Sequence, residues 1–169
     1  MLKRVALPAI GRWVAAVFVA ATASSIIWVQ LHPHIRAFGK AGAVQLDEGA
    51  RYAMFSDSGL FIVIAAVGGL VLSLIFLLQR RQRSLTPAEV LTGAVVASAY
   101  AALTWQFGIL LDALLHHGVS PFPPTKLADG TEVVAALTLD TFAALAVPAL
   151  VWSLVSLIDA IVGGNERHG

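Results

Sequence analysis

The chain contains no cysteine among its 169 residues. Disulfide bonds, thiolate metal sites and thiol nucleophiles are therefore excluded. Charged residues are scarce, at 12% of the sequence, whereas hydrophobic residues make up 58% and the mean hydropathy is +0.82. This composition departs from that of soluble domains and indicates an integral membrane protein with a single domain, residues 1–169.

Signatures of several common enzyme families are also missing. The sequence has no Walker loop, no Gly-rich dinucleotide turn, no G-x-S-x-G elbow and no H-E-x-x-H helix. Its formal net charge of +1 gives no reason to expect nucleic-acid binding. We therefore expect a protein that is not an enzyme, uses no cofactor and has membrane lipid around it.

One uncharged apolar run, residues 59–78, organises the rest of the chain. At about 1.5 Å of rise per residue, a helix of this length crosses the roughly 30 Å hydrocarbon core of a bilayer. Arg80, Arg81 and Arg83 follow at once and mark the cytoplasmic side by the positive-inside rule. The run predicts a transmembrane helix that ends in the cytoplasm.

Three further apolar segments predict membrane helices over residues 13–31, 87–115 and 131–162. Thr86, Pro87 and Glu89 form a capping box with a proline at the first helical position, so the third helix should begin near residue 87. The basic N-terminus also fits a signal peptide cleaved at Ala21-Thr22-Ala23. An uncleaved helix is expected, because the apolar run continues past that site to an interfacial Trp28.

The predicted fold class is all-α, an integral membrane four-helix bundle with both termini cytoplasmic, in the plasma membrane. Residues 32–58 form a structured outer segment, in which residues 47–55 could be a short surface helix before a cap at Asp57. Seven of the 11 basic residues then lie inside, as the positive-inside rule requires. These are Lys3, Arg4, Arg12, Arg80, Arg81, Arg83 and Arg167.

Two helices carry small residues at four-residue spacing, which lets another backbone approach closely. The second predicted helix has Ala65, Gly69 and Ser73, and the third has Gly93, Ala97 and Ala101. We expect both faces to mediate helix packing. Polar residues also lie inside predicted spans: Thr22, Ser24, Ser25, Thr104 and Gln106. The buried amide could line a pathway or ligand pocket, but hydrogen bonding across helices is expected.

Three carboxylates, Asp57, Asp112 and Asp140, fall at the outer ends of the second, third and fourth predicted helices. They could converge into an acidic rim that holds a cation or a basic patch of a partner. The simpler alternative is that Asp57 caps a helix and the other two are solvated. Because an anion is unfavourable at a helix C-terminus, Asp112 should have a cationic neighbour such as Arg51 or Lys126.

Histidines cluster near the same outer ends. His116 and His117 follow Asp112, and His32 and His34 flank Pro33 in the first outer segment. Imidazole and carboxylate groups are ligands for zinc or copper. No known metal-site spacing is matched, so these histidines are expected to be solvated and no metal site is predicted.

Four short motifs carry a resemblance: Trp28-Val29-Gln30-Leu31-His32-Pro33, Phe55-Ser56-Asp57-Ser58-Gly59, Arg80-Arg81-Gln82-Arg83 and Trp105-Gln106-Phe107-Gly108. Together they resemble a family of small uncharacterised four-helix membrane proteins of actinobacteria. The resemblance implies a fold and an envelope location, and it brings no activity with it.

We expect a non-catalytic accessory or stabilising subunit that docks through its small-residue faces to a larger envelope or respiratory membrane complex. A small-molecule or ion transporter or channel that acts as an oligomer is the alternative. An integral membrane enzyme that uses the outer Asp and His groups comes third.

Overall fold

The computed structural model describes residues 7–32, 36–40, 43–46, 48–79, 85–116, 132–134 and 142–165. Side chains are described for residues 11–32, 52, 56–79, 85–115 and 143–162. Arg12 is the one Lys or Arg residue within these ranges. Asp140 lies outside the described residues.

Four long helices dominate the described part of the chain: α1 (Leu7–Leu31), α2 (Glu48–Gln79), α3 (Pro87–His116) and α4 (Val147–Asn165). Each contains a stretch long and apolar enough to cross a membrane: Gly11–Leu31, Ser56–Gln79, Pro87–Leu115 and Ala143–Val162. The prediction of an all-α fold with four helices long and apolar enough to cross a membrane is therefore confirmed.

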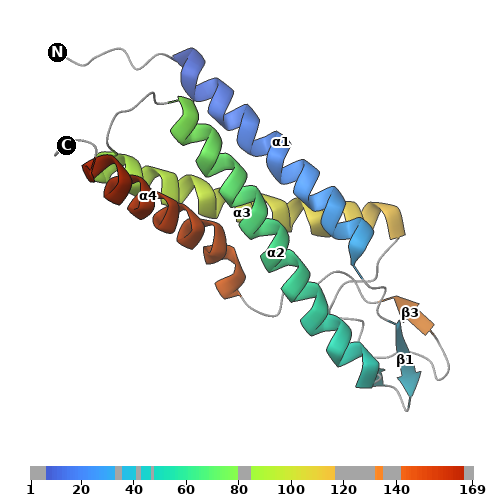
Figure 1. Cartoon of the computed structure of the whole chain (residues 1–169). Helices are drawn as coiled ribbons and strands as arrows, with labels where there is room; N and C mark the ends of the chain where they lie inside the picture. The colour runs from blue at the N-terminus through green and yellow to red at the C-terminus, as the bar shows by residue number, and fades with distance from the viewer. Residues whose placement is uncertain are drawn as a thin grey trace.

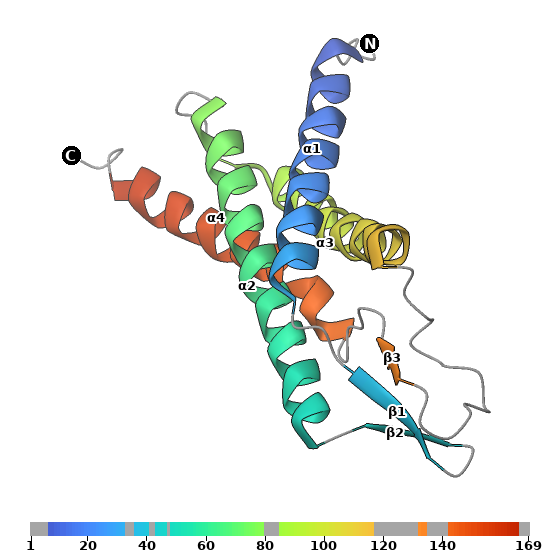
Figure 2. The ribbon, with the colours of Figure 1, turned by 90° about the vertical axis from the view of Figure 1, so that its right-hand side faces the viewer.

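The helices pack in alternating directions (Figure 1). Helix α1 packs along α3, and α4 packs against both α2 and α3. The start of α1, the end of α2, the start of α3 and the end of α4 lie at one end of the bundle, here called the terminal end. Strands β1 and β3 lie at the other end, here called the sheet end (Figures 1 and 2).

A small antiparallel sheet covers part of the sheet end and was not predicted. Strand β1 (Arg36–Lys40) pairs with β2 (Ala43–Leu46) on one side and with β3 (Glu132–Val134) on the other, giving the order β2-β1-β3. Phe38 lies opposite Gln45 in one pair and opposite Glu132 in the other. The sheet thus joins two segments that are far apart in the sequence.

Three predicted helix starts are wrong. Helix α1 begins at Leu7, before the predicted residue 13. Helix α2 begins at Glu48 and is continuous to Gln79, so the predicted separate surface helix and the cap at Asp57 are replaced by one long helix. The predicted helix over residues 131–162 begins instead with a 3₁₀ turn, η1 (Phe142–Ala146), and α4 follows. Residues 132–134 find strand partners in β1, and tertiary pairing overrides their local preference.

The start of α3 is as predicted. The backbone N–H and hydroxyl of Thr86 both donate to Glu89 Oε2, at 2.8 and 2.6 Å, and Glu89 N–H donates back to Thr86 Oγ1 at 3.4 Å. Pro87 occupies the first helical position, where its missing N–H costs no hydrogen bond. Local sequence therefore fixes this helix end.

The small residues of α2 and α3 pack within the chain itself. A Cβ added at Gly69 would lie 2.9 Å from Pro148 Cβ, and one added at Gly93 would lie 2.1 Å from the Trp152 ring. Ala65 and Ala101 belong to one buried cluster with Trp28, Phe61 and Ala144. Ser73 and Ala97 are also buried. These faces therefore bring α4 and α1 close to α2 and α3.

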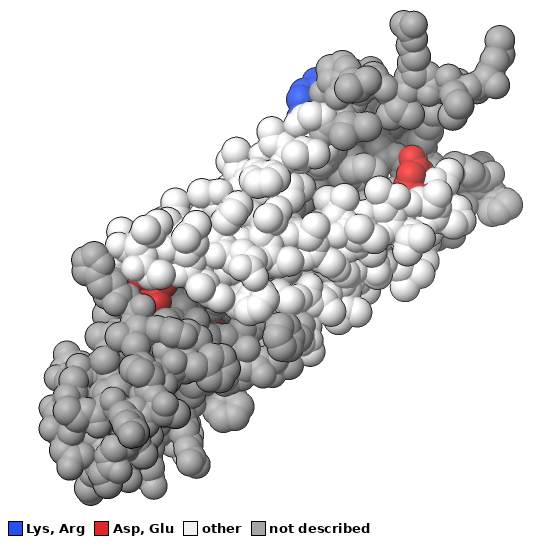
Figure 3. Space-filling model, turned by 180° about the vertical axis from the view of Figure 1, so that it is seen from behind, with Lys and Arg blue, Asp and Glu red and all other residues white. Residues whose placement is uncertain are grey.

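Large apolar side chains cover the outside of the bundle. Leu78 and Val19 are 80% and 70% exposed, and Leu150 is 66% exposed. In Figure 3 the described surface between the two ends is free of charged side chains, which appear only toward the ends. A charge-free surface with so many large exposed apolar side chains is rare on soluble proteins and matches a lipid environment.

Candidate functional site

A cluster of buried ionisable side chains lies at the sheet end of the bundle. His32 directly follows the last turn of α1. Asp57 lies at the start of the membrane span of α2, and Asp112 lies in the last turns of α3. The exposed fractions of the three residues are 4%, 1% and 3%. Three helices thus each supply one ionisable group to a site closed to solvent.

The imidazole of His32 lies between the two carboxylates. Its Nδ1 is 3.9 Å from Asp57 Oδ1, and its Nε2 is 4.0 Å from Asp112 Oδ1. The backbone N–H of His32 donates to Trp28 O at 2.9 Å, so α1 continues its hydrogen bonding to this residue. That bond fixes His32 on the same face of α1 as Trp28.

Trp28 holds one side of the cluster in place. Its indole N–H donates to Asp57 Oδ1 at 2.8 Å, and its ring packs edge-on against Phe61 at 4.8 Å between centroids. A hydrogen bond to a buried carboxylate is stronger than one between neutral groups. Trp28 is fully buried, so the predicted interfacial role of this residue is wrong.

The sequence placed Asp57 and Asp112 at one depth, and the structure brings them to opposite sides of one imidazole. Neither carboxylate is solvated, and Asp57 is inside a helix, so the simpler alternative of a cap and solvated groups is wrong for both. The side chains of Arg51 and Lys126, the expected cationic neighbours, lie outside those described, as do those of His34, His116 and His117.

Within the described residues, no three His, Asp or Glu side chains are arranged to hold a metal ion.

Hydroxyl groups join α1 to α3 about two to three turns from the cluster, toward the terminal end. Ser24 Oγ and Tyr100 Oη share a hydrogen bond of 2.7 Å, and Ser25 Oγ donates to Thr104 O at 2.8 Å. Thr104 in turn donates to Tyr100 O at 2.9 Å. Ser24 and Ser25 therefore hydrogen-bond across helices, as predicted, whereas the Thr104 hydroxyl bonds within α3 and Gln106 is exposed.

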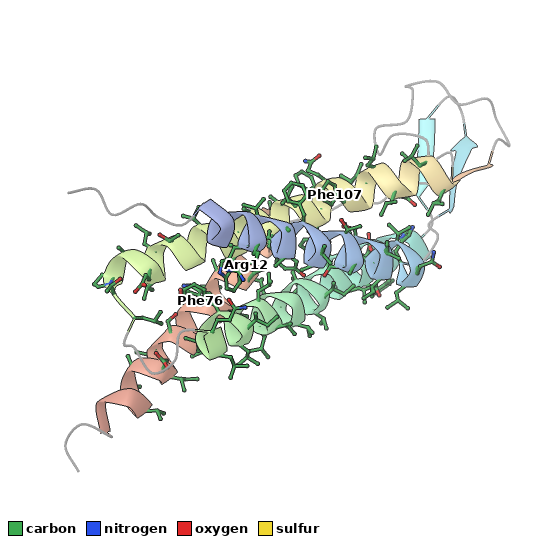
Figure 4. All side chains as sticks on the ribbon, turned by 90° about the horizontal axis from the view of Figure 1, so that it is seen from above. Arg12, Phe76 and Phe107 are labelled. Atoms are coloured by element: carbon green, nitrogen blue, oxygen red, sulfur yellow. The ribbon has the colours of Figure 1, made fainter. Side chains whose placement is uncertain are left out.

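Below these contacts α1 diverges from α2 toward the terminal end (Figure 2), and a groove opens. Its volume is about 620 Å³, and residues of all the long helices line it. Three aromatic rings form a row along it: Trp13 lies 5.4 Å from Phe76, and Phe76 lies 5.2 Å from Trp152, between centroids. In Figure 4, Phe76 and Arg12 are labelled toward this end and Phe107 farther along the bundle.

The polar side chains that line the groove already make hydrogen bonds. Ser73 donates to Gly69 O at 2.7 Å, Thr92 donates to Ala88 O at 2.8 Å, and Glu89 accepts from Thr86. The indole N–H of Trp152 donates to Val90 O at 2.7 Å. An occupant of the groove would therefore meet mainly hydrocarbon and aromatic surface.

Sequence reasoning missed the role of His32 and the groove. The available signal for His32 was its four-residue spacing from Trp28 at the end of a span, on the face that turns inward. The groove had no such signal, because it depends on the angle between α1 and α2.

The helices and their apolar spans define a small multi-pass membrane protein. Comparison with protein-family models, with curated proteins and with solved structures gives no match for the chain. Its function is therefore argued from the two sites.

Proposed function

We propose that the protein is a non-catalytic membrane protein that takes up an apolar molecule from the bilayer into the groove. The observation that carries this proposal is the groove itself, about 620 Å³ lined by Trp13, Phe76 and Trp152 and by small residues. Small-molecule sites typically enclose roughly 300–1,000 Å³ and are mostly apolar.

The groove opens sideways into the lipid-facing surface. Two of its lining residues on α1, Val14 and Phe18, are 51% and 46% exposed, and Val96 on α3 is 38% exposed. A molecule already dissolved in the bilayer can therefore enter without crossing water. Since the lining hydroxyls and Glu89 are engaged in helix hydrogen bonds, the occupant we favour is a hydrocarbon chain, such as that of a lipid or fatty acid.

The test uses a brominated fatty acid, whose bromine atoms quench tryptophan fluorescence on contact, added to the protein in mild detergent. Thr92→Phe places a ring in the groove, because Thr92 is exposed and lines it. Leu91→Phe is the matched control, because Leu91 is the preceding residue, is 69% exposed and is not among the lining residues.

We expect saturable quenching in the wild type and in Leu91→Phe, and at least tenfold weaker binding in Thr92→Phe. Equal quenching in the three proteins, or quenching that never saturates, would contradict the proposal. Thermal unfolding of each variant verifies that the loss of binding is not a loss of fold.

The accessory-subunit role expected from the sequence remains a proposal and needs a different docking surface. Gly69 and Gly93 are covered by Pro148 and Trp152 of the same chain. Copurification in mild detergent with a stoichiometric larger membrane protein would support that role. The transporter alternative accords with the groove, because uptake from the bilayer is the first step of such transport.

We also propose an orientation of the chain in the membrane and its membership of a protein family. We place both termini in the cytoplasm because basic residues are concentrated in the terminal segments and in residues 80–83, which follow α2 in the sequence. The motif resemblance supports membership of the actinobacterial membrane protein family. A reporter fused after Gln82 tests the orientation, and its export would overturn it.

A further inference from the structure

We propose that His32, Asp57 and Asp112 form a buried proton-binding site at the sheet end, in which the imidazole is held as an imidazolium between the two carboxylates. The site is separate from the groove and does not depend on the function proposed for it. Proton uptake forms one N–H bond on the imidazole and breaks one O–H bond of hydronium, which leaves a neutral water molecule.

The geometry around the ring favours the protonated form. Nδ1 faces Asp57 at 3.9 Å and Nε2 faces Asp112 at 4.0 Å, so each nitrogen has a carboxylate oxygen as its neighbour. Neutral imidazole has an N–H on only one nitrogen, and its other nitrogen would present a lone pair to an anion. Imidazolium carries an N–H on both nitrogens, so both contacts become attractive.

Burial makes the charge of the cluster important. The three side chains are almost completely excluded from solvent. Interactions between charges in such a buried site are screened less than they are in water. If both carboxylates are ionised, the three groups carry a charge of −2 with neutral imidazole and −1 with imidazolium. Ionisable groups buried in membrane segments are costly, and for that reason they are commonly functional.

The same contacts link three helices. Asp57 is fixed from α1 by the Trp28 indole N–H at 2.8 Å, and His32 reaches from α1 toward both α2 and α3. Proton uptake therefore strengthens attraction between the helices at the sheet end, and proton loss weakens it. Among the described side chains, the titratable groups that face His32 are Asp57 on α2 and Asp112 on α3.

The test is nitrogen NMR of the full chain labelled at histidine, in lipid nanodiscs, titrated from about pH 5 to pH 8, the range in which an ordinary histidine changes charge. Subtracting the spectrum of His32→Gln assigns the His32 signal among the five histidines. We expect His32 to be imidazolium at neutral pH, with both nitrogens protonated. A neutral ring at that pH would overturn the proposal.

Two carboxylate variants test whether the aspartates stabilise the protonated His32. They can be measured even if His32→Gln does not fold. Asp57→Asn and Asp112→Asn keep the shape of each side chain and remove its charge. Each variant should move the midpoint of the His32 titration to lower pH, which corresponds to a proton affinity at least threefold lower. Asp159→Asn on α4, a partly exposed site outside the cluster, is the control and should leave the midpoint unchanged. Midpoints unaffected by the cluster variants would also overturn the proposal.

Discussion

Gly93→Ala tests whether the small-residue face of α3 is used inside the chain. The added Cβ would lie 2.1, 2.3 and 2.4 Å from Cε2, Cζ2 and Nε1 of Trp152. All three distances are far below van der Waals contact, so either the indole or the helix must move. The indole is anchored by its hydrogen bond to Val90 O and by its edge contact with Phe76.

The expected cost follows from these contacts. Forcing extra volume into a packed site typically costs about 1–3 kcal/mol. If the indole moves away, the bond to Val90 O is lost as well, at about 1 kcal/mol. We therefore expect Gly93→Ala to lower the free energy of unfolding by roughly 2–4 kcal/mol, the sum of the two effects.

Gly59→Ala is the matched control for the same substitution. Gly59 also lies within a long helix, but no atom outside its own turn lies within 4 Å of an added Cβ. Removing the conformational freedom of glycine should stabilise α2 by about 0.5–1 kcal/mol. The two substitutions are therefore expected to have opposite signs.

Both variants can be measured by denaturant unfolding in mixed micelles, followed by tryptophan fluorescence. If Gly93→Ala is as stable as Gly59→Ala, the packing of Trp152 over α3 is refuted. If Gly93→Ala instead loses a copurifying partner while its stability is unchanged, the small-residue face of α3 docks to another protein. That result would support the accessory-subunit proposal.

Three further substitutions test single contacts by the same unfolding measurement. Trp28→Phe keeps an aromatic ring beside Phe61 and removes the hydrogen bond to Asp57; we expect a loss of about 1.5–3 kcal/mol, typical of bonds to charged groups. Thr86→Ala removes the cap of α3 and should cost about 0.5–2 kcal/mol, and an unchanged stability would mean that the cap is dispensable. Tyr100→Phe removes the bond to the hydroxyl on α1 and should cost only about 0.6 kcal/mol, so a loss several times larger would show that the hydroxyl does more than join two helices.

Helix content could be read from the sequence because it depends on local chemistry. Long uncharged runs must be helical where no water satisfies the backbone, and the capping box at Thr86 marks a start within the range of its own side chains. The start of α2 was misplaced because a polar first segment can continue a helix above the lipid, and hydropathy does not register it. The sheet was missed because its strands are short and pair across a long separation in sequence.

The candidate site was partly foreseen. Asp57 and Asp112 were grouped because the ends of neighbouring helices share a depth, which depends only on span length. Burial of both carboxylates and their position on either side of His32 depend on how far α1, α2 and α3 are rotated about their own axes. Hydropathy carries no information on that rotation.

The amino-acid order alone is enough to predict long apolar helices suited to a membrane, since transfer free energy and backbone hydrogen bonding act residue by residue. Which helix faces meet depends on how the helices pack in three dimensions. Gly93 receives Trp152 rather than another protein, α1 diverges from α2 to open a groove, and a histidine expected in water is enclosed by two aspartates. These outcomes depend on side-chain shape across several helices at once, which no single segment encodes.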